Sequence, residues 1–266
     1  MDNLKIAIIQ TPLHWENKGK NLNMLSAKIA QVEQDQDLMV LPEMFSTGFS
    51  MQPERFAEHM DGDSVTWLRR RAKQYNSVIA GSLIIKDLDS YRNRLIWMRP
   101  DGNYDYYDKR HLFRLANEQD HYVAGNKRKI VSLKEWRINL NICYDLRFPV
   151  WSRNNEDYDI LLNVANWPAK RSHAWKTLLR ARAIENMCYV IGLNRVGDDG
   201  NGFFHSGDSA IVHPDGTAIE ACSVREKIIY ASLSKEELLA YRDRFQFYKD
   251  RDTFVITTQS DNSESC

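Results

Sequence analysis

The segment Ile138-Asn-Leu-Asn-Ile-Cys-Tyr-Asp-Leu-Arg-Phe-Pro-Val-Trp151 decides the fold, because it joins a buried strand to a sharp corner. Apolar residues alternate with two asparagines over its first five positions, the period of two that is typical of a strand. Cys143 stands where this strand stops, and Pro149 is suited to the first turn of a following helix. Backbone N–H groups at such a corner lower the pKa of a thiol and can hold an oxyanion. Cysteine is also among the most buried residue types, so simple packing is the other interpretation of Cys143.

The composition is that of an ordinary globular protein. The chain has 266 residues, of which 27% are charged and 43% hydrophobic, and its 36 Lys and Arg balance 36 Asp and Glu. Because no net charge attracts a polyanion, we expect no nucleic-acid partner and no binding to an anionic membrane. The first residues lack a basic region followed by an apolar run, and no stretch of about 18 apolar residues exists, so we expect neither a secretory signal nor a membrane span.

The cysteines favour a reducing compartment. Cys143, Cys188, Cys222 and Cys266 are far apart and show none of the regular spacing of a disulfide-rich domain. We therefore expect free thiols and a cytoplasmic protein.

Strand-like and helix-like segments alternate along the chain. Apolar or alternating runs predict strands at residues 5–10, 37–41, 78–85, 93–98, 104–107, 137–143, 158–164, 189–194, 209–213, 217–220 and 228–232. Helical spacing predicts helices at residues 17–34, 170–187 and 233–242, and another that Ser64 caps and that carries Trp67, Leu68, Ala72 and Tyr75. This pattern predicts an α/β fold in which two mixed sheets pack face to face. We assign residues 1–256 to one domain and residues 257–266 to a polar tail.

Three charged residues, Glu43, Lys109 and Glu118, are candidates for catalysis because of where they stand in the sequence. Glu43 ends a strongly apolar strand, where a carboxylate is costly unless it is paired or serves as a base. Lys109 follows a strand with three tyrosines, and Glu118 lies in the loop after it. Taken singly, Glu43 and Glu118 have surface interpretations, and the stem of Lys109 could pack on aromatic rings with its ammonium in water.

Taken together, the sequence words around these residues are specific. Leu-Pro-Glu-Met-Phe at Glu43, Tyr-Asp-Lys-Arg-His-Leu-Phe at Lys109 and Ile-Cys-Tyr-Asp-Leu-Arg-Phe-Pro at Cys143 occur in this order. In these words the chain resembles the nitrilase (carbon–nitrogen hydrolase) superfamily, from the first strand to about residue 250. The resemblance implies a four-layer α-β-β-α sandwich, and it implies a homodimer that pairs through helices to give eight layers.

The resemblance also implies catalytic roles. Cys143 would be the nucleophile, Glu43 the general base, Lys109 the stabiliser of the transition state and Glu118 a supporting carboxylate. The physical chemistry agrees, because a base must take the thiol proton, and Lys109 with the backbone N–H of Tyr144 would hold the oxyanion. This scheme needs no cofactor and no metal, and the seven histidines show no metal-ligand spacing.

Within the superfamily the chain is most similar to the omega-amidase branch, whose substrates are 2-oxoglutaramate and 2-oxosuccinamate. The supporting words are Cys-Tyr-Asp-Leu-Arg-Phe-Pro, His-Leu-Phe-Arg and Asn-Val-Ala-Asn-Trp-Pro at residues 163–168. Such a substrate carries a carboxylate, so a cation should face the pocket. The candidates are Arg147, Lys170 and Arg171, although for Arg147 we favour an ion pair within the corner. Trp167 and Phe203 would form apolar walls or fill the core.

Other functions remain open at this level. An N-carbamoyl-amine hydrolase or a general aliphatic amidase would use the same catalytic residues on another small-molecule amide. A non-catalytic scaffold is the alternative outside the enzyme class. A scaffold has no reason to keep a buried Glu, Lys and Cys around one pocket, since each is costly there without compensation.

Overall fold

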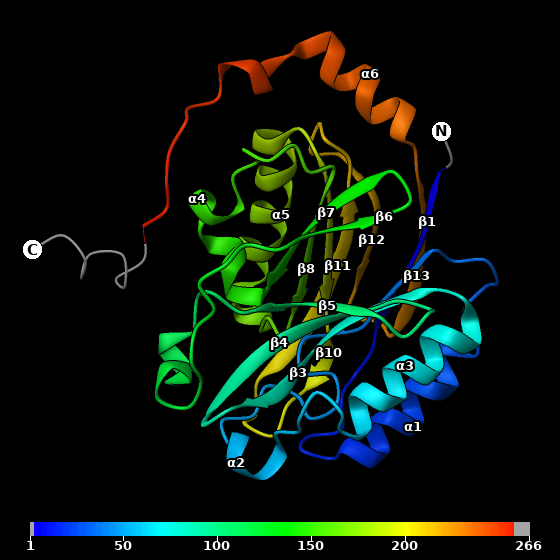
Figure 1. The fold of residues 1–266 in the computed structure, drawn as a ribbon, viewed down its shortest axis with the longest axis vertical. Helices are drawn as coiled ribbons and strands as arrows, with labels where there is room; N and C mark the ends of the chain where they lie inside the picture. Colours follow the sequence, from blue (N-terminus) through cyan, green and yellow to red (C-terminus); the bar gives the residue numbers. More distant parts are fainter. Residues whose placement is uncertain (1–2, 258–266) are drawn as a thin grey trace, which may run out of the picture.

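The computed structural model describes residues 3–257 and has four layers (Figure 1). The first sheet has the strand order β13-β1-β2-β3-β4-β5, and the second has β10-β11-β9-β8-β7-β6 with β12 paired to β11. Helices α1 and α3 cover the outer face of the first sheet, and α5 covers the outer face of the second (Figure 1). This arrangement confirms the predicted fold class.

Thirteen strands and six α-helices lie within residues 3–257. The strands are β1 Leu4–Gln10, β2 Leu38–Val40, β3 Val78–Asp87, β4 Ser90–Met98, β5 Tyr104–Asp108, β6 Ile130–Leu133, β7 Trp136–Ile142, β8 Ile160–Ala165, β9 Tyr189–Asn194, β10 Val196–Asp198, β11 Phe204–Val212, β12 Ala218–Ser223 and β13 Lys227–Leu233. The α-helices are α1 Lys18–Ile29, α2 Pro53–Phe56, α3 Asp63–Tyr75, α4 Pro149–Ser152, α5 Ser172–Asn186 and α6 Lys235–Phe245.

The apolar strands are buried on both faces, which explains why they read as almost continuous hydrophobic runs. On β1, Ile6 and Ile8 pack in the large core between the two sheets, while Ala7 and Ile9 pack in a second core beneath α1 and α3. Residues next to each other on a strand point to opposite faces, so one strand contributes to both cores.

Most predicted elements are confirmed, with differences at short or irregular segments. The prediction omitted α2, β6 and β10, and β11 begins at Phe204 rather than at residue 209. The cap assigned to Ser64 is wrong. Helix α3 begins at Asp63, and the backbone N–H of Ser64 donates to the buried Glu58 carboxylate at 2.7 Å, so an acidic side chain from the preceding loop satisfies this helix end.

The functional segments leave strands at their carboxyl ends. Glu43 follows β2, Lys109 follows β5, Cys143 follows β7 and Asn166 follows β8. Since β7 and β8 are parallel neighbours, Cys143 and Asn166 emerge side by side. Packing of the two sheets then brings Glu43 and Lys109 from the first sheet against Cys143 and Asn166 from the second.

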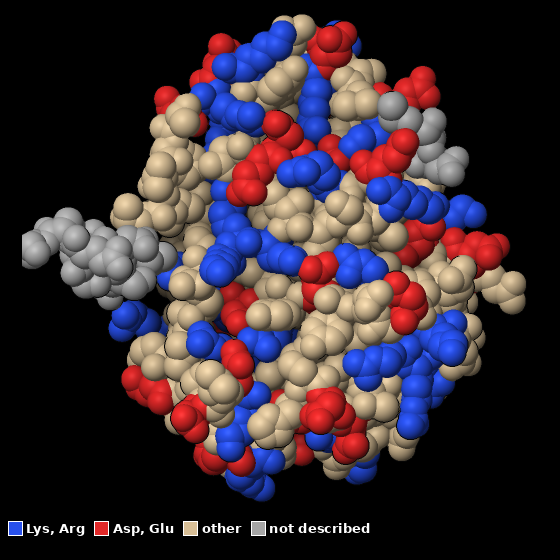
Figure 2. All heavy atoms as spheres, viewed as in Figure 1, with Lys and Arg blue, Asp and Glu red and all other residues tan. Residues whose placement is uncertain are grey.

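The surface shows acidic and basic side chains interspersed, without one dominant sign on the face seen in Figure 2. Within residues 3–257, no helix is both long enough and apolar enough to cross a membrane. The predicted tail lies outside the described residues except for residue 257, and the domain boundary at residue 256 stays a prediction.

Candidate active site

Cys143 lies at a backbone corner that is strained for a non-glycine residue. Its φ is +43°, in the left-handed region, and it begins a short 3-10 helix, Cys143–Arg147. Pro149 then occupies the first turn of α4, as predicted. The thiol is 8% exposed, and its Sγ lies 3.9 Å from the carbonyl oxygen of Asn166. The corner therefore holds one thiol at the floor of the site with little contact with water.

Lys109 lies between two carboxylates, and all three side chains are fully buried. Its Nζ donates to Glu43 Oε1 at 3.0 Å and to both oxygens of Glu118, at 3.0 and 2.9 Å. The ammonium also lies 5.0 Å from the ring centre of Phe49. The structure thus brings together all four residues to which we assign catalytic roles from the sequence.

Burial dominates the electrostatics of this cluster. It raises the pKa of the Cys143 thiol well above its usual range, with Glu43 adding to the effect and Lys109 opposing it. The expectation of a lowered thiol pKa at the corner is therefore wrong, because desolvation outweighs the N–H groups. Burial disfavours the Lys109 ammonium, but Glu118 and Glu43 outweigh it and raise the pKa of Lys109. A protonated thiol beside a permanent cation needs a base before it can attack.

Two asparagines that sequence reasoning missed hold Glu43 in place. The side chain of Asn93 donates to Glu43 Oε1 at 2.8 Å, and the backbone N–H of Asn166 donates to Oε2 at 2.7 Å. The Asn166 side chain also donates to the Glu43 backbone carbonyl at 2.7 Å. Asn166 lies in the segment 163–168 that supports the family resemblance, and this segment could have indicated its role. No local sequence pattern indicates a role for Asn93.

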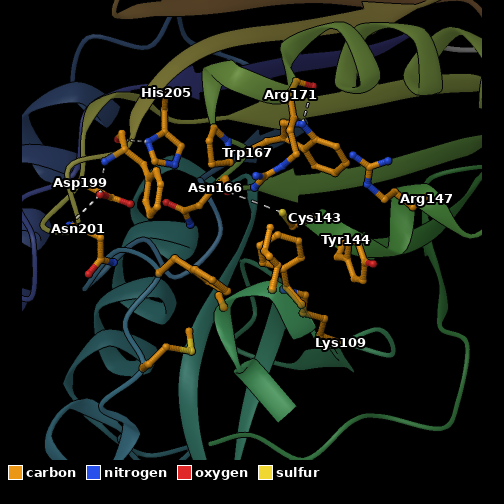
Figure 3. A pocket seen from close by; sticks show the side chains of 17 residues that line it. Lys109, Cys143, Tyr144, Arg147, Asn166, Trp167, Arg171, Asp199, Asn201 and His205 are labelled. Atoms are coloured by element: carbon orange, nitrogen blue, oxygen red, sulfur yellow. Dashed lines mark hydrogen bonds between the residues drawn. The ribbon is translucent and has the colours of Figure 1, made fainter. Parts of the chain in front are cut away.

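A cavity of about 350 Å³ opens above Cys143 and Lys109. Figure 3 shows Arg147 to the right of Cys143, Arg171 above it, and Asp199, Asn201 and His205 to the left. Tyr144 lines the cavity and lies edge-on to the ring of Phe113, with 5.0 Å between ring centres. The space is large enough for a small organic substrate and has a cationic side.

The five predicted substrate-binding residues separate into two groups. Arg147, Trp167, Arg171 and Phe203 line the cavity, whereas Lys170 is exposed and is not among the lining residues. Trp167 is 3% exposed, so it both fills the core and forms a wall, and Phe203 is 46% exposed at the rim.

The two arginines of the cavity have no carboxylate partner within the described chain. The ion pair that we favoured for Arg147 is therefore wrong, and its guanidinium lies 5.0 Å from the ring centre of Trp167 instead. Arg171 lies 4.9 Å from the ring centre of Phe113. Burial lowers the pKa of Arg171, and the positive charge of Arg147 lowers it further, while Cys143 opposes the shift. The pair is an uncompensated positive region beside the thiol.

Apart from Phe203, the side of the cavity formed by residues 199–205 was not predicted. Asp199 accepts hydrogen bonds from the backbone N–H groups of Asn201 and Phe203, at 2.8 and 2.9 Å, so it shapes the turn between β10 and β11. Burial and the nearby Arg195 lower the pKa of His205 to about 4, which keeps this imidazole neutral at physiological pH. Among residues 3–257, no group of three or more His, Cys, Asp and Glu side chains is arranged to hold a metal ion.

Comparison with known proteins places this geometry in context. Residues 5–243 match the carbon-nitrogen hydrolase family. The chain is 46% identical to omega-amidase YafV of Escherichia coli K12, over 96% of this chain and 100% of the relative. It is 30% identical to 2-oxoglutaramate amidase of Bacillus subtilis, over 92% and 96%. The solved structure of XC1258 from Xanthomonas campestris, a CN-hydrolase superfamily protein with an arsenic adduct in its active site, matches with a TM-score of 0.94 at 42% identity, over 97% of this chain and 100% of that one.

Proposed function

This chain belongs to the carbon-nitrogen hydrolase family, and we propose that it is an omega-amidase that hydrolyses the side-chain amide of 2-oxoglutaramate and 2-oxosuccinamate. The observation that carries the substrate is the pair Arg147 and Arg171, which face the cavity beside Cys143 and have no carboxylate partner among residues 3–257. A substrate carboxylate would supply the missing negative charge. The names of the relatives, omega-amidase and 2-oxoglutaramate amidase, support the same substrate class.

In the proposed mechanism, Glu43 takes the proton of Cys143 while Sγ attacks the amide carbon. A base is required because burial keeps the thiol protonated. The new S–C bond gives a tetrahedral oxyanion, which the Lys109 ammonium and the backbone N–H of Tyr144 stabilise. Glu43 then gives its proton to the leaving nitrogen, the C–N bond breaks, and ammonia departs from a thioester.

In the second half of the reaction, water hydrolyses the thioester with the help of the same groups. Glu43 takes a proton from water, the resulting hydroxide attacks the thioester carbon, and Lys109 again stabilises the oxyanion. The S–C bond breaks, the carboxylic acid leaves, and the proton returns from Glu43 to the thiolate. Glu118 binds Lys109 through both oxygens, so its role is to keep the ammonium charged and aimed.

Ammonia release from four amides, measured side by side, tests the substrate assignment. The four are 2-oxoglutaramate, 2-oxosuccinamate, a plain aliphatic amide and an N-carbamoyl amine. We expect turnover of the two oxo-acid amides and little of the other two, because only the first pair places a carboxylate against the arginines. Preference for the plain amide or the carbamoyl amine would reject the omega-amidase assignment in favour of an aliphatic amidase or an N-carbamoyl-amine hydrolase. No turnover of any amide would favour the scaffold.

Removing a guanidinium should weaken substrate binding rather than the chemistry. For Arg171→Ala we expect KM for 2-oxoglutaramate to rise roughly 10- to 100-fold with little change in kcat, since a hydrogen bond to a charged group is worth about 1.5–3 kcal/mol. Arg147→Ala should act in the same direction. The matched control is Lys170→Ala, a neighbouring cation outside the cavity, which should leave KM unchanged. A KM for the Arg171 variant equal to that of the control would reject this role.

We also propose that the protein works as a homodimer in the cytoplasm. Val150 on α4 and Ile184 on α5 are 55% and 53% exposed, so each helix leaves an apolar side chain on the surface that a second subunit could cover. The described cysteines Cys143, Cys188 and Cys222 are free thiols, which suits a reducing compartment. Sedimentation of the purified chain as a monomer, or recovery outside the cytoplasm in cell fractions, would contradict the respective proposal.

A further inference from the structure

Asp145 lies two residues after the thiol and is completely buried. Each of its carboxylate oxygens has two polar partners within hydrogen-bond distance, so its four acceptor sites are occupied. It has no place in the proposed reaction, because its oxygens face these donors and it does not line the cavity. Its position calls for a separate explanation.

The donors come from the two segments that carry the reacting groups. Oδ1 accepts from the backbone N–H of His111 at 2.9 Å and lies 2.8 Å from Nδ1 of the same residue. Oδ2 accepts from the Tyr107 hydroxyl at 2.8 Å and from the backbone N–H of Ile142 at 3.0 Å. Tyr107 and His111 stand on either side of Lys109 in the chain, and Ile142 immediately precedes Cys143. One carboxylate therefore joins the lysine segment of the first sheet to the thiol corner of the second.

The corner needs such support because of its backbone. Cys143 has φ +43°, a conformation that a residue with a side chain keeps only when its surroundings enforce it. The hydrogen bond from Ile142 to Asp145 closes the 3-10 turn around Cys143, with the side chain of the third residue accepting from the backbone before the turn. The ring of His111 stacks on Phe148 with 3.6 Å between ring centres. Because Phe148 directly follows the 3-10 helix, this contact holds the lysine segment against the end of the corner as well.

From these contacts we propose that Asp145 is a positioning residue that sets the thiol of Cys143 relative to Lys109 and Glu43. The role rests on the proposed function, since it assumes that Cys143 attacks and Lys109 stabilises the oxyanion. A misplacement of about 1 Å in such a site can cost roughly 100-fold in rate. Asp145 thus acts on the reaction through two other residues without touching the substrate.

The substitution Asp145→Asn tests this role with almost no change in volume. An amide has one accepting oxygen, and its nitrogen can only donate. If that nitrogen faces Ile142, the N–H of Ile142 loses its acceptor, and in the opposite orientation the N–H of His111 loses it. Either orientation leaves one backbone N–H, that of Ile142 or that of His111, without its acceptor, so the substitution removes one hydrogen bond from the network.

We expect Asp145→Asn to lower kcat for 2-oxoglutaramate at least about 100-fold with KM changed less than about threefold, because the arginines of the cavity are not altered. His111→Ala keeps the backbone N–H and removes the ring with its contacts to Asp145 and Phe148, so we expect a smaller loss of kcat, about tenfold. This milder variant keeps the test decisive if Asp145→Asn does not fold.

A second readout does not depend on turnover. Iodoacetamide labelling at Cys143, followed by peptide mass spectrometry, should slow at least about tenfold in Asp145→Asn, because the thiol loses its alignment with Glu43. Cys188 is 0% exposed and serves as an internal control, since it becomes labelled only if the fold opens. Slow labelling of Cys143 with Cys188 still protected would separate misplacement from unfolding.

The matched control is Asp159→Asn. Asp159 is 2% exposed and accepts from the backbone N–H of Arg137 at 2.9 Å and from Arg242 at 3.0 Å, but it precedes β8, at the end of that strand opposite Asn166. We expect lower stability with kcat within about threefold of the unaltered chain, because the buried network is lost far from the reacting groups.

The results separate the two proposals. Full kcat and full Cys143 labelling in a folded Asp145→Asn protein would overturn the positioning role while the proposed function stands. An equal loss in Asp145→Asn and Asp159→Asn would also overturn it, since any buried carboxylate would then matter as much. If the unaltered chain neither releases ammonia nor labels at Cys143, the proposed function itself fails and the positioning role fails with it.

Discussion

Replacing Cys143 by alanine should lower ammonia release from 2-oxoglutaramate by at least about 10⁴-fold. The expected size follows from removing the only protein atom that bonds to the acyl carbon in the proposed reaction. Stability should change little, because the substitution removes one sulfur atom at the edge of the core and its 3.9 Å contact with the Asn166 carbonyl. The cavity and its two arginines remain, so the variant should still bind substrate. Steady-state kinetics and isothermal titration with 2-oxoglutaramate measure the two properties separately.

Cys188→Ala is the control for this substitution. Cys188 is fully buried, and its Sγ contacts the carbonyl of Arg182 on α5, away from the cavity. We expect kcat within about threefold of the unaltered chain and a small loss of stability from the lost packing. Turnover by Cys143→Ala at more than about 1% of the original rate would mean that another group attacks the amide.

Replacing Lys109 by methionine should damage both activity and stability. Loss of the ammonium removes one oxyanion partner, which is worth about 10²–10³ in kcat. It also leaves Glu43 and Glu118 buried without their cation, and breaking a buried ion pair from one side costs about 3–5 kcal/mol. Burial already raises the pKa of Glu118, so we expect this carboxyl to take up a proton in the variant. Denaturant unfolding and steady-state kinetics give the two measurements.

The double variant with Lys109→Met and Glu118→Gln separates the two losses. The second substitution removes one unpaired carboxylate, so part of the lost stability should return while kcat stays low. The control outside the site is Lys235→Met, which removes a cation from Asp159 and should lower stability with kcat unchanged. Recovery of kcat together with stability in the double variant would show that Lys109 acts only through the fold.

The sequence predicts this fold well where its signals are local. Each long apolar strand carries its own pattern, and the words around Glu43, Lys109 and Cys143 predict a cluster that the structure does assemble. Short elements such as β6 and β10 span too few residues for a period to emerge. The cap of α3 was mispredicted because the group that accepts from the Ser64 backbone N–H is the Glu58 carboxylate. Glu58 lies in the preceding loop, and the usual capping pattern considers only residues at the helix end itself.

The surroundings of the reacting groups depend on contacts between distant residues. Asn93 and Asn166 bind Glu43 across 50 and 123 positions of the chain, and no local pattern marks such partners. Arg147 illustrates a different difficulty. Its place in the corner suggested an ion pair, but both carboxylate oxygens of the nearby Asp145 accept from other donors. The Arg147 guanidinium therefore stacks on Trp167 and faces the cavity.

The most direct test of the central claim is acid quench of the enzyme with 2-oxoglutaramate at times spanning the first turnover, followed by peptide mass spectrometry. We predict that the peptide containing Cys143 gains the mass of the substrate acyl group, without its ammonia, and that hydroxylamine removes the adduct as it does a thioester. Cys143→Ala should show no adduct on any peptide. Ammonia release with Cys143 unmodified at every quench time, or with the acyl group on another residue, would contradict the account.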